Sequence, residues 1–250
     1  MSELFSIQLQ NRQQQGRDGV WLDLPTTTEQ VQAALRQIGI SSDNPQGLFI
    51  SGYFAEEEKR FAIPYNMVLA SNVDELNFLA SRLETLSTGE RAELNAALQA
   101  PQSELFSIGR ITDFPENVDY YVHLPDVHGP AQLGDYYLNR SGMVDMPEEW
   151  KGGIDTAQFG RYVAQQEQGA FTQYGYLVKS GDAWQKVHEG QPVPEEYRVL
   201  SFPAPEVLRD SANIPPPIQS EPQLQKVLPI ILNGKDSAER MKEITDRLET

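Results

Sequence analysis

The sequence contains no cysteine, so disulfide bonds and thiolate metal sites are excluded, as is common in the reducing cytoplasm. Its longest apolar runs, such as Val227–Leu232, fall far short of the ~20 residues that a membrane-spanning helix needs. The N-terminus also lacks the basic and apolar pattern of a secretory signal. From these absences we expect a cytoplasmic protein that makes no contact with a membrane.

The sequence motifs of common enzymes are also missing. It has no dinucleotide-binding glycine pattern, phosphate-binding loop, nucleophile elbow or zinc-binding His-Glu-x-x-His. His123 and His128 do not share a helical face, and His188 lies in a predicted strand, so we expect ordinary polar or packing roles for all three. Residues 56–58 are three glutamates followed by Lys59 and Arg60, which indicates a solvated turn rather than a calcium loop. The sequence therefore predicts a protein that is not an enzyme and that holds no cofactor or metal.

Basic residues are scarce: 20 Lys and Arg stand against 36 Asp and Glu, which gives a net charge of −16. The imbalance is concentrated between residues 53 and 159, where 18 acidic and 7 basic residues give −11. Phosphate contacts need Lys and Arg, so this region is not expected to bind duplex DNA directly. Two interpretations of the acidity remain, namely general solubility and a dedicated interaction surface, and composition alone favours solubility.

Apolar residues make up 39% of the chain, enough for a folded core, and the first part of the sequence predicts a small sheet with one helix. Phe5–Gln10 alternates apolar and polar residues, as a half-buried strand does, and Val20–Leu24 and Leu48–Phe54 are the expected partner strands. Thr26 and Glu29 have the spacing of a capping box, which predicts that a helix begins there.

A helical pair is predicted next. Asn72–Glu75 has the composition of a helix start, with acidic residues where the helix dipole favours them, and leucines follow at helical spacing to Leu86. Thr88–Ala100 predicts a second helix packed against the first.

The third part mixes helix and strand. The stretch 113–150 is rich in proline and aromatic residues and predicts short helices, and Phe159–Gln166 predicts a further helix. Ala170–Leu177 and Ala183–Glu189 read as a hairpin around the turn residues 180–182.

The predicted fold class is therefore α+β, with three small consecutive domains. Residues 1–64 form the sheet with its helix, 65–110 the helical unit, and 111–199 a second unit of hairpin and helices. Residues 200–250 are predicted to be a proline-rich linker and the start of a C-terminal helix.

Five segments, in order along the chain, resemble the ArdA antirestriction family. They are Gly19–Pro25, Val73–Leu83, Leu133–Tyr137, Phe159–Val163 and Gly175–Leu177, and the resemblance covers about residues 4–199. It implies an elongated, dimeric α+β protein of three small domains. It also implies a function in mobile genetic elements, where such proteins disarm type I restriction-modification enzymes by occupying their DNA-binding groove.

In this resemblance carboxylates stand in for phosphates, because duplex DNA carries about one negative charge per 1.7 Å of axis. The acidic residues of the middle region are the expected DNA-mimic surface: Glu56, Glu57, Glu58, Asp74, Glu75, Glu84, Glu90, Glu93, Asp113, Glu116, Asp119 and Asp126. The expected partner is the DNA-binding groove of a restriction-modification enzyme. We expect the interface of the homodimer in the last third of the chain.

Two further expectations concern the tail and the target. Met241–Leu248 resembles the opening of an ArdC-like domain, which predicts that the chain is a fragment of a longer polypeptide. The alternative function is an acidic interaction module of a mobile-element protein that acts on a different DNA-binding partner, since any basic groove would attract the same charges.

Overall fold

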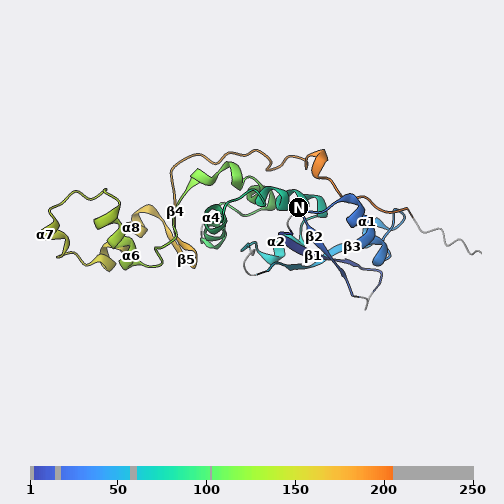
Figure 1. Cartoon of the computed structure of the whole chain (residues 1–250), viewed down its shortest axis with the longest axis horizontal. Helices are drawn as coiled ribbons and strands as arrows, with labels where there is room; N and C mark the ends of the chain where they lie inside the picture. The colour runs from blue at the N-terminus through green and yellow to red at the C-terminus, as the bar shows by residue number, and fades with distance from the viewer. Residues whose placement is uncertain (1–2, 15–17, 57–60, 102, 205–250) are drawn as a thin grey trace, which may run out of the picture. The chain divides into compact units, whose positions relative to one another are not determined.

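The computed structural model describes residues 3–14, 18–56, 61–101 and 103–204 (Figure 1). The fold class is α+β, as predicted: two three-stranded antiparallel sheets are combined with helices. The predicted linker and C-terminal helix lie, from residue 205 onward, outside the described residues, and so do Glu57 and Glu58.

The first sheet has the order β2 (Val20–Leu24), β1 (Phe5–Asn11), β3 (Leu48–Phe54). Every second residue of β1, from its first to its last, is buried, which is the alternation that predicted the strand. The three predicted strands and their antiparallel pairing are confirmed. Helix α1 (Thr28–Gln37) covers the buried face with an apolar stripe that includes Val31.

The predicted start of α1 is wrong by one residue. The capping box is formed by Thr27 and Gln30, not by Thr26 and Glu29. The backbone N–H of Thr26 instead donates a 2.7 Å hydrogen bond to the side-chain oxygen of Asn77, a residue of another helix. Thr27 and Gln30 have the same spacing as the predicted pair, so two local patterns were available, and the long-range bond of Thr26 goes with the one that the fold uses.

Three helices follow the first sheet: α2 (Tyr65–Leu69), α3 (Val73–Leu83) and α4 (Thr88–Gln99). Both longer helices of the predicted pair are confirmed. Each begins with a complete capping box, Asn72 with Glu75 for α3 and Ser87 with Glu90 for α4.

Short elements occupy the region that proline and aromatic residues dominate, as predicted. They are η3 (Phe114–Glu116), η4 (Val118–Tyr120), α6 (Pro130–Asp135), the π-helical η5 (Tyr136–Arg140) and α7 (Glu148–Lys151). One strand in this region, β4 (Tyr121–Leu124), was not predicted. Two further short elements lie outside this region: the 3₁₀ turn η1 (Pro45–Gly47) before β3, and α5 (Ile108–Thr112).

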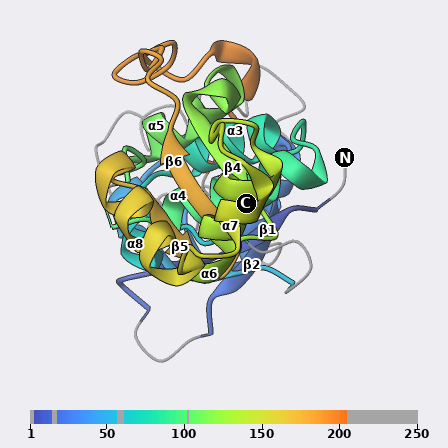
Figure 2. The same ribbon diagram turned by 90° about the vertical axis from the view of Figure 1, so that its left-hand side faces the viewer.

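The second sheet corrects the predicted hairpin. Its order is β4, β6 (Gly175–Lys179), β5 (Ala170–Thr172), and β5 and β6 turn at residues 173–174, inside the segment predicted as one strand (Figure 2). Residues 183–189 form no strand, so His188 does not lie in one. Buried side chains bind the backbone of this segment instead, as described below.

Helix α8 (Thr156–Glu167) packs closely on α6 because two glycines face each other. A β-carbon on Gly134 would collide with the carbonyl oxygen of Thr156, and one on Gly160 would collide with that of Pro130. Both glycines lie in segments that carry the sequence resemblance, so the close helix contact accounts for those positions.

Two apolar clusters hold the described fold together. The large cluster joins the first sheet to helices α1–α5 and reaches Tyr121, Leu177 and Val199, whereas the small one centres on Val127, Leu133 and Tyr176. The predicted boundaries between the three domains remain a prediction.

Residues 183–204, here called the return segment, lead from the second sheet back to α1 (Figure 1). Apart from the 3₁₀ turn η6 (Glu195–Tyr197), they form no helix or strand, so side chains bind their backbone groups. Asn117 exchanges hydrogen bonds with the backbone of Gln185, and Asn77 donates one of 3.0 Å to the carbonyl oxygen of Tyr197.

Candidate functional site

The structure separates the twelve predicted surface acids by their exposure. Glu56, Asp119 and Asp126 are exposed, and a further six are half-buried: Asp74, Glu75, Glu84, Glu90, Glu93 and Glu116. Asp113 is fully buried, and Glu57 and Glu58 lie outside the described residues.

Helix α3 fixes two of the acids at its first turn. The carboxylate of Glu75 accepts a 3.2 Å hydrogen bond from the backbone N–H of Asn72, and the side chain of Asn72 accepts one from the backbone of Glu75. One oxygen of Asp74 accepts hydrogen bonds of 2.7 Å from the backbone N–H groups of both Val199 and Leu200. The helix N-terminus and these hydrogen bonds stabilise both negative charges in defined positions.

Helix α4 and the turn η4 bring three carboxylates together. Burial, and to a lesser extent the charges of Glu90 and Asp119, raise the pKa of Glu93 from 4.5 to about 8. One carboxylate oxygen of Glu93 is buried and has no hydrogen-bond partner among the described residues. The fold therefore brings carboxyl groups from distant parts of the sequence near one another, and burial together with the neighbouring charges makes Glu93 resist ionisation.

Hydrogen bonds from Ser87 have the opposite effect on Glu90 and lower its pKa. Glu90 closes the capping box of α4 through a 2.7 Å hydrogen bond from the backbone N–H of Ser87. Glu90 and Glu93 therefore differ in pKa, because the carboxylate of Glu90 accepts hydrogen bonds whereas one oxygen of Glu93 has no partner among the described residues.

Glu116 is held by a basic residue of α3. Arg82 donates to its carboxylate and forms an ion pair with it, which links η3 to the helix. The pair reduces the net charge at this position, so Glu116 contributes less negative potential than its neighbours.

The prediction that Asp113 belongs to the surface is wrong. Its side chain is 0% exposed and accepts hydrogen bonds from the backbone N–H groups of Val187, His188 and Glu189 at 3.3, 2.6 and 3.1 Å. A buried carboxylate needs such donors, and here they come from a segment some 75 residues away. Asp113 anchors the return segment and cannot touch a partner.

Glu104 and Glu189 are not among the twelve predicted surface acids, and ion pairs within the fold neutralise both of them. Arg110 is only 8% exposed and binds Glu104 at 3.0 Å and Glu189 at 3.1 Å. Lys179 also binds Glu104, at 2.7 Å, and its hydrogen bond lowers the pKa of that carboxyl group. These carboxylates hold the return segment and β6 in place.

The histidines have structural partners. The ring of His123 makes a 2.7 Å hydrogen bond with the carbonyl oxygen of Tyr174, and the ring of His188 packs edge-on against Phe78 at 4.9 Å. Within the described ranges, no group of three or more His, Asp or Glu residues is placed to hold a metal ion. None of the helices described is long and apolar enough for a membrane span.

A comparison with models of known protein families identifies the family of this chain. The family model described as antirestriction protein (ArdA) matches residues 15–178, which is more than half of the chain. The chain belongs to the ArdA family. A comparison with curated proteins gave no match.

The family match confirms the resemblance drawn from five sequence segments. It includes the acids from Glu56 to Asp126, both sheets from β2 onward and the contact between Gly134 and Gly160. As a member of the ArdA family, the protein is an antirestriction protein whose partner is a restriction-modification enzyme.

Proposed function

We propose that the protein inhibits type I restriction-modification enzymes by placing carboxylates in their DNA-binding groove, in the manner of a DNA mimic. The acidic surface is defined here by its described members: Glu56, Asp74, Glu75, Glu84, Glu90, Glu93, Glu116, Asp119 and Asp126. The observation that carries the proposal is that the charges of Glu90 and Asp119 act on the half-buried Glu93, so carboxyl groups from α4 and η4 lie near one another, as phosphates do along a DNA backbone.

A basic groove would relieve this crowding. Phosphate-binding Lys and Arg side chains lower the free energy of neighbouring carboxylates, so they would return the pKa of Glu93 toward its ordinary value. The same charges would steer the two proteins together at a rate that falls as salt concentration rises. No catalytic residue and no cofactor are needed, because the inhibitor acts by occupying the groove.

The acids are also preorganised. Capping boxes hold Glu75 and Glu90, and an ion pair holds Glu116. Side chains that are already fixed lose less conformational entropy on binding, which favours a rigid array of carboxylates over scattered flexible ones. This arrangement favours the interpretation that the acidic residues form an interaction surface over the interpretation that they serve solubility alone.

We further propose that the active form is a cytoplasmic homodimer. Three large apolar side chains in the predicted third domain are exposed: Met143 at 73%, Trp150 at 67% and Tyr162 at 61%. Exposed apolar side chains of this size are typical of interfaces between subunits. They support a dimer contact within residues 143–162, which lie before the last third of the chain where the contact was expected.

A neutralised variant tests the proposed mechanism. Glu84→Gln, Glu90→Gln, Asp119→Asn and Asp126→Asn together remove four charges from the acidic surface. The matched control removes four exposed charges elsewhere, through Asp18→Asn, Asp43→Asn, Glu195→Gln and Glu196→Gln. The readout is inhibition of DNA cleavage by a purified type I enzyme, with folding checked by circular dichroism.

The surface variant is expected to lose inhibition and the control to retain it. Equal inhibition by both variants would overturn the mimicry mechanism. If the folded wild-type protein inhibits no type I enzyme, the target is a different DNA-binding protein and the proposal is wrong in that respect.

A further inference from the structure

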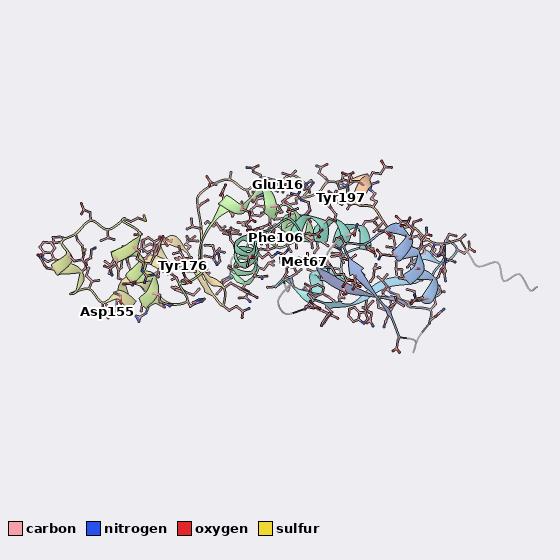
Figure 3. The ribbon with its side chains drawn as sticks, in the orientation of Figure 1. Met67, Phe106, Glu116, Asp155, Tyr176 and Tyr197 are labelled. Carbon is pink, nitrogen blue, oxygen red and sulfur yellow. The ribbon has the colours of Figure 1, made fainter. Side chains whose placement is uncertain are left out.

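A cavity of about 930 Å³ lies between the N-terminal part of α3, the start of α5 and the return segment. Met67 and Phe106, labelled in Figure 3, both line it. The cavity is separate from the crowded carboxylates of α4 and η4, none of which lines it. No role described above requires a cavity at this place.

The apolar part of the wall contains two phenylalanine rings beside aliphatic side chains such as Met67 and Leu200. Phe78 is buried and packs against both His188 and Tyr197, with ring centroids 4.9 and 4.7 Å apart. Phe106, by contrast, is 63% exposed, although an exposed phenylalanine ring gains nothing from the core. The guanidinium of Arg110 lies 4.6 Å from the ring centre of Phe106, so this ring already binds one cation.

The polar part of the wall is acidic. Asp74, Glu75 and Glu189 line the cavity together with one basic side chain, Arg198, whose Nε donates a 2.6 Å hydrogen bond to the carbonyl oxygen of Val193. Glu189 is neutralised by Arg110, so Asp74 and Glu75 at the start of α3 determine the sign of the potential. This wall repels a phosphate or carboxylate and attracts a cation.

Aromatic rings beside carboxylates match the chemistry of an arginine side chain. Its planar guanidinium stacks on a ring face and donates to carboxylate oxygens, while its aliphatic stem packs against apolar side chains. A lysine ammonium is more strongly hydrated and lacks the planar face. Among cationic groups, the cavity therefore favours guanidinium.

We propose that this cavity binds an arginine side chain of the partner enzyme. The inference rests on the proposed function, because Asp74 and Glu75 belong both to the acidic surface and to the cavity. Arginines that contact phosphates when the enzyme binds DNA are exposed in its empty groove, and one of them enters the cavity. The cavity thus adds a contact that a DNA backbone does not offer.

A short peptide tests the site without the enzyme. Acetyl-Gly-Arg-Gly-amide is titrated into the full ¹⁵N-labelled chain, and amide shifts are followed by NMR, with the citrulline peptide as an uncharged control of the same shape. The arginine peptide is expected to shift the amide signals of residues around the cavity, Ser71, Gly109 and Gly190 among them. The citrulline peptide is expected to bind at least about fivefold more weakly. Equal binding of the two peptides, or no binding of either, overturns the inference.

Two substitutions test which side chains of the cavity wall bind the arginine peptide. Glu75→Gln keeps the capping box, since Gln also serves at this position, and removes one charge from the wall. Phe106→Leu keeps an apolar side chain and removes the aromatic face. Each is expected to weaken the arginine peptide by about three- to fivefold.

The matched controls are Glu29→Gln in the first turn of α1 and Phe54→Leu, a phenylalanine that is 57% exposed. Neither residue lines the cavity, so neither control is expected to change peptide binding. An equal loss in Glu29→Gln and Glu75→Gln would show that net charge alone binds the peptide and would overturn the site.

Inhibition of the type I enzyme by the variants then distinguishes this inference from the proposed function. Phe106→Leu is expected to weaken inhibition of the type I enzyme by about three- to fivefold, whereas Phe54→Leu leaves inhibition unchanged. Full inhibition by Phe106→Leu, together with loss of inhibition in the four-acid variant, overturns this inference and leaves the proposed function intact. Selective arginine-peptide binding by a chain that inhibits no type I enzyme refutes the proposed function and supports the cavity's preference for arginine.

Discussion

The carboxylate of Asp113 accepts a 2.6 Å hydrogen bond from the backbone N–H of His188, and it binds the neighbouring N–H groups of Val187 and Glu189 as well. One buried negative charge thereby holds a segment that has no sheet partner. The acidity of the chain consequently serves two purposes: most acids of the middle region lie at the surface, and Asp113 organises the return segment.

Asp113→Asn is expected to destabilise the fold. The amide retains one acceptor oxygen but places an NH₂ group against backbone donors, and the charge that strengthens the hydrogen bonds is lost. We expect the free energy of unfolding to fall by about 2–3 kcal/mol, measured by urea denaturation. Asp43→Asn, at an exposed position, serves as control, and a loss as small as that of the control would contradict the anchoring role.

Glu93 is expected to make stability depend on pH. Its pKa of about 8 in the folded chain lies above its unfolded value of 4.5, so the protonated form favours the fold. This contribution is fully present below about pH 4.5 and is lost as pH rises through about 8.

Glu93→Gln removes that dependence, because glutamine does not ionise. At pH 9 the variant is expected to be more stable than the wild type by on the order of 1–2 kcal/mol, after discounting for the exposed part of the side chain. At pH 4 the two should be nearly equal. Denaturation curves across this range measure the difference, and parallel pH profiles for variant and wild type would show that Glu93 is not desolvated.

The contact between α6 and α8 depends on the absence of side chains at Gly134 and Gly160. Gly160→Ala places a methyl group against the carbonyl oxygen of Pro130 and is expected to lower the free energy of unfolding by about 2–3 kcal/mol. Gly89→Ala is the control, because a β-carbon there meets nothing within 4 Å and alanine is the better helix former. It should leave stability unchanged or raise it by about 0.5–1 kcal/mol. Equal effects of the two substitutions in thermal unfolding would contradict the close packing.

Trp150 offers a test of the dimer. It is exposed on α7, and Trp150→Ala removes a large apolar surface that no described core requires. The variant is expected to dissociate at protein concentrations where the wild type is a dimer, as measured by sedimentation equilibrium. A wild-type chain that sediments as a monomer would contradict the homodimer directly.

Much of the local structure could be predicted from sequence because the determining contacts are close together in the chain. Alternation in β1 and the cap at Asn72 are examples, and both are confirmed. The predictions that failed did so for two different reasons. At α1 two overlapping capping patterns were present, and the fold uses Thr27 with Gln30. In the second hairpin a distant residue, Asp113, binds the segment that was predicted to be a strand.

In the candidate site, too, some features could be predicted from the sequence and others depend on the fold. Clustering of acids along the sequence is visible from composition, whereas the interaction of Glu93 with Asp119 depends on where the fold places α4 and η4. The cavity beside Phe106 could not be predicted, because its walls come from three separate stretches of the chain.

The measurement that tests the central claim most directly is competition between the purified protein and a fluorescent DNA duplex for a purified type I methyltransferase, at several salt concentrations. The account predicts that the protein displaces the duplex and that the apparent affinity falls steeply as salt rises. Failure of a folded protein to displace the duplex at low salt, or displacement that is insensitive to salt, would contradict it.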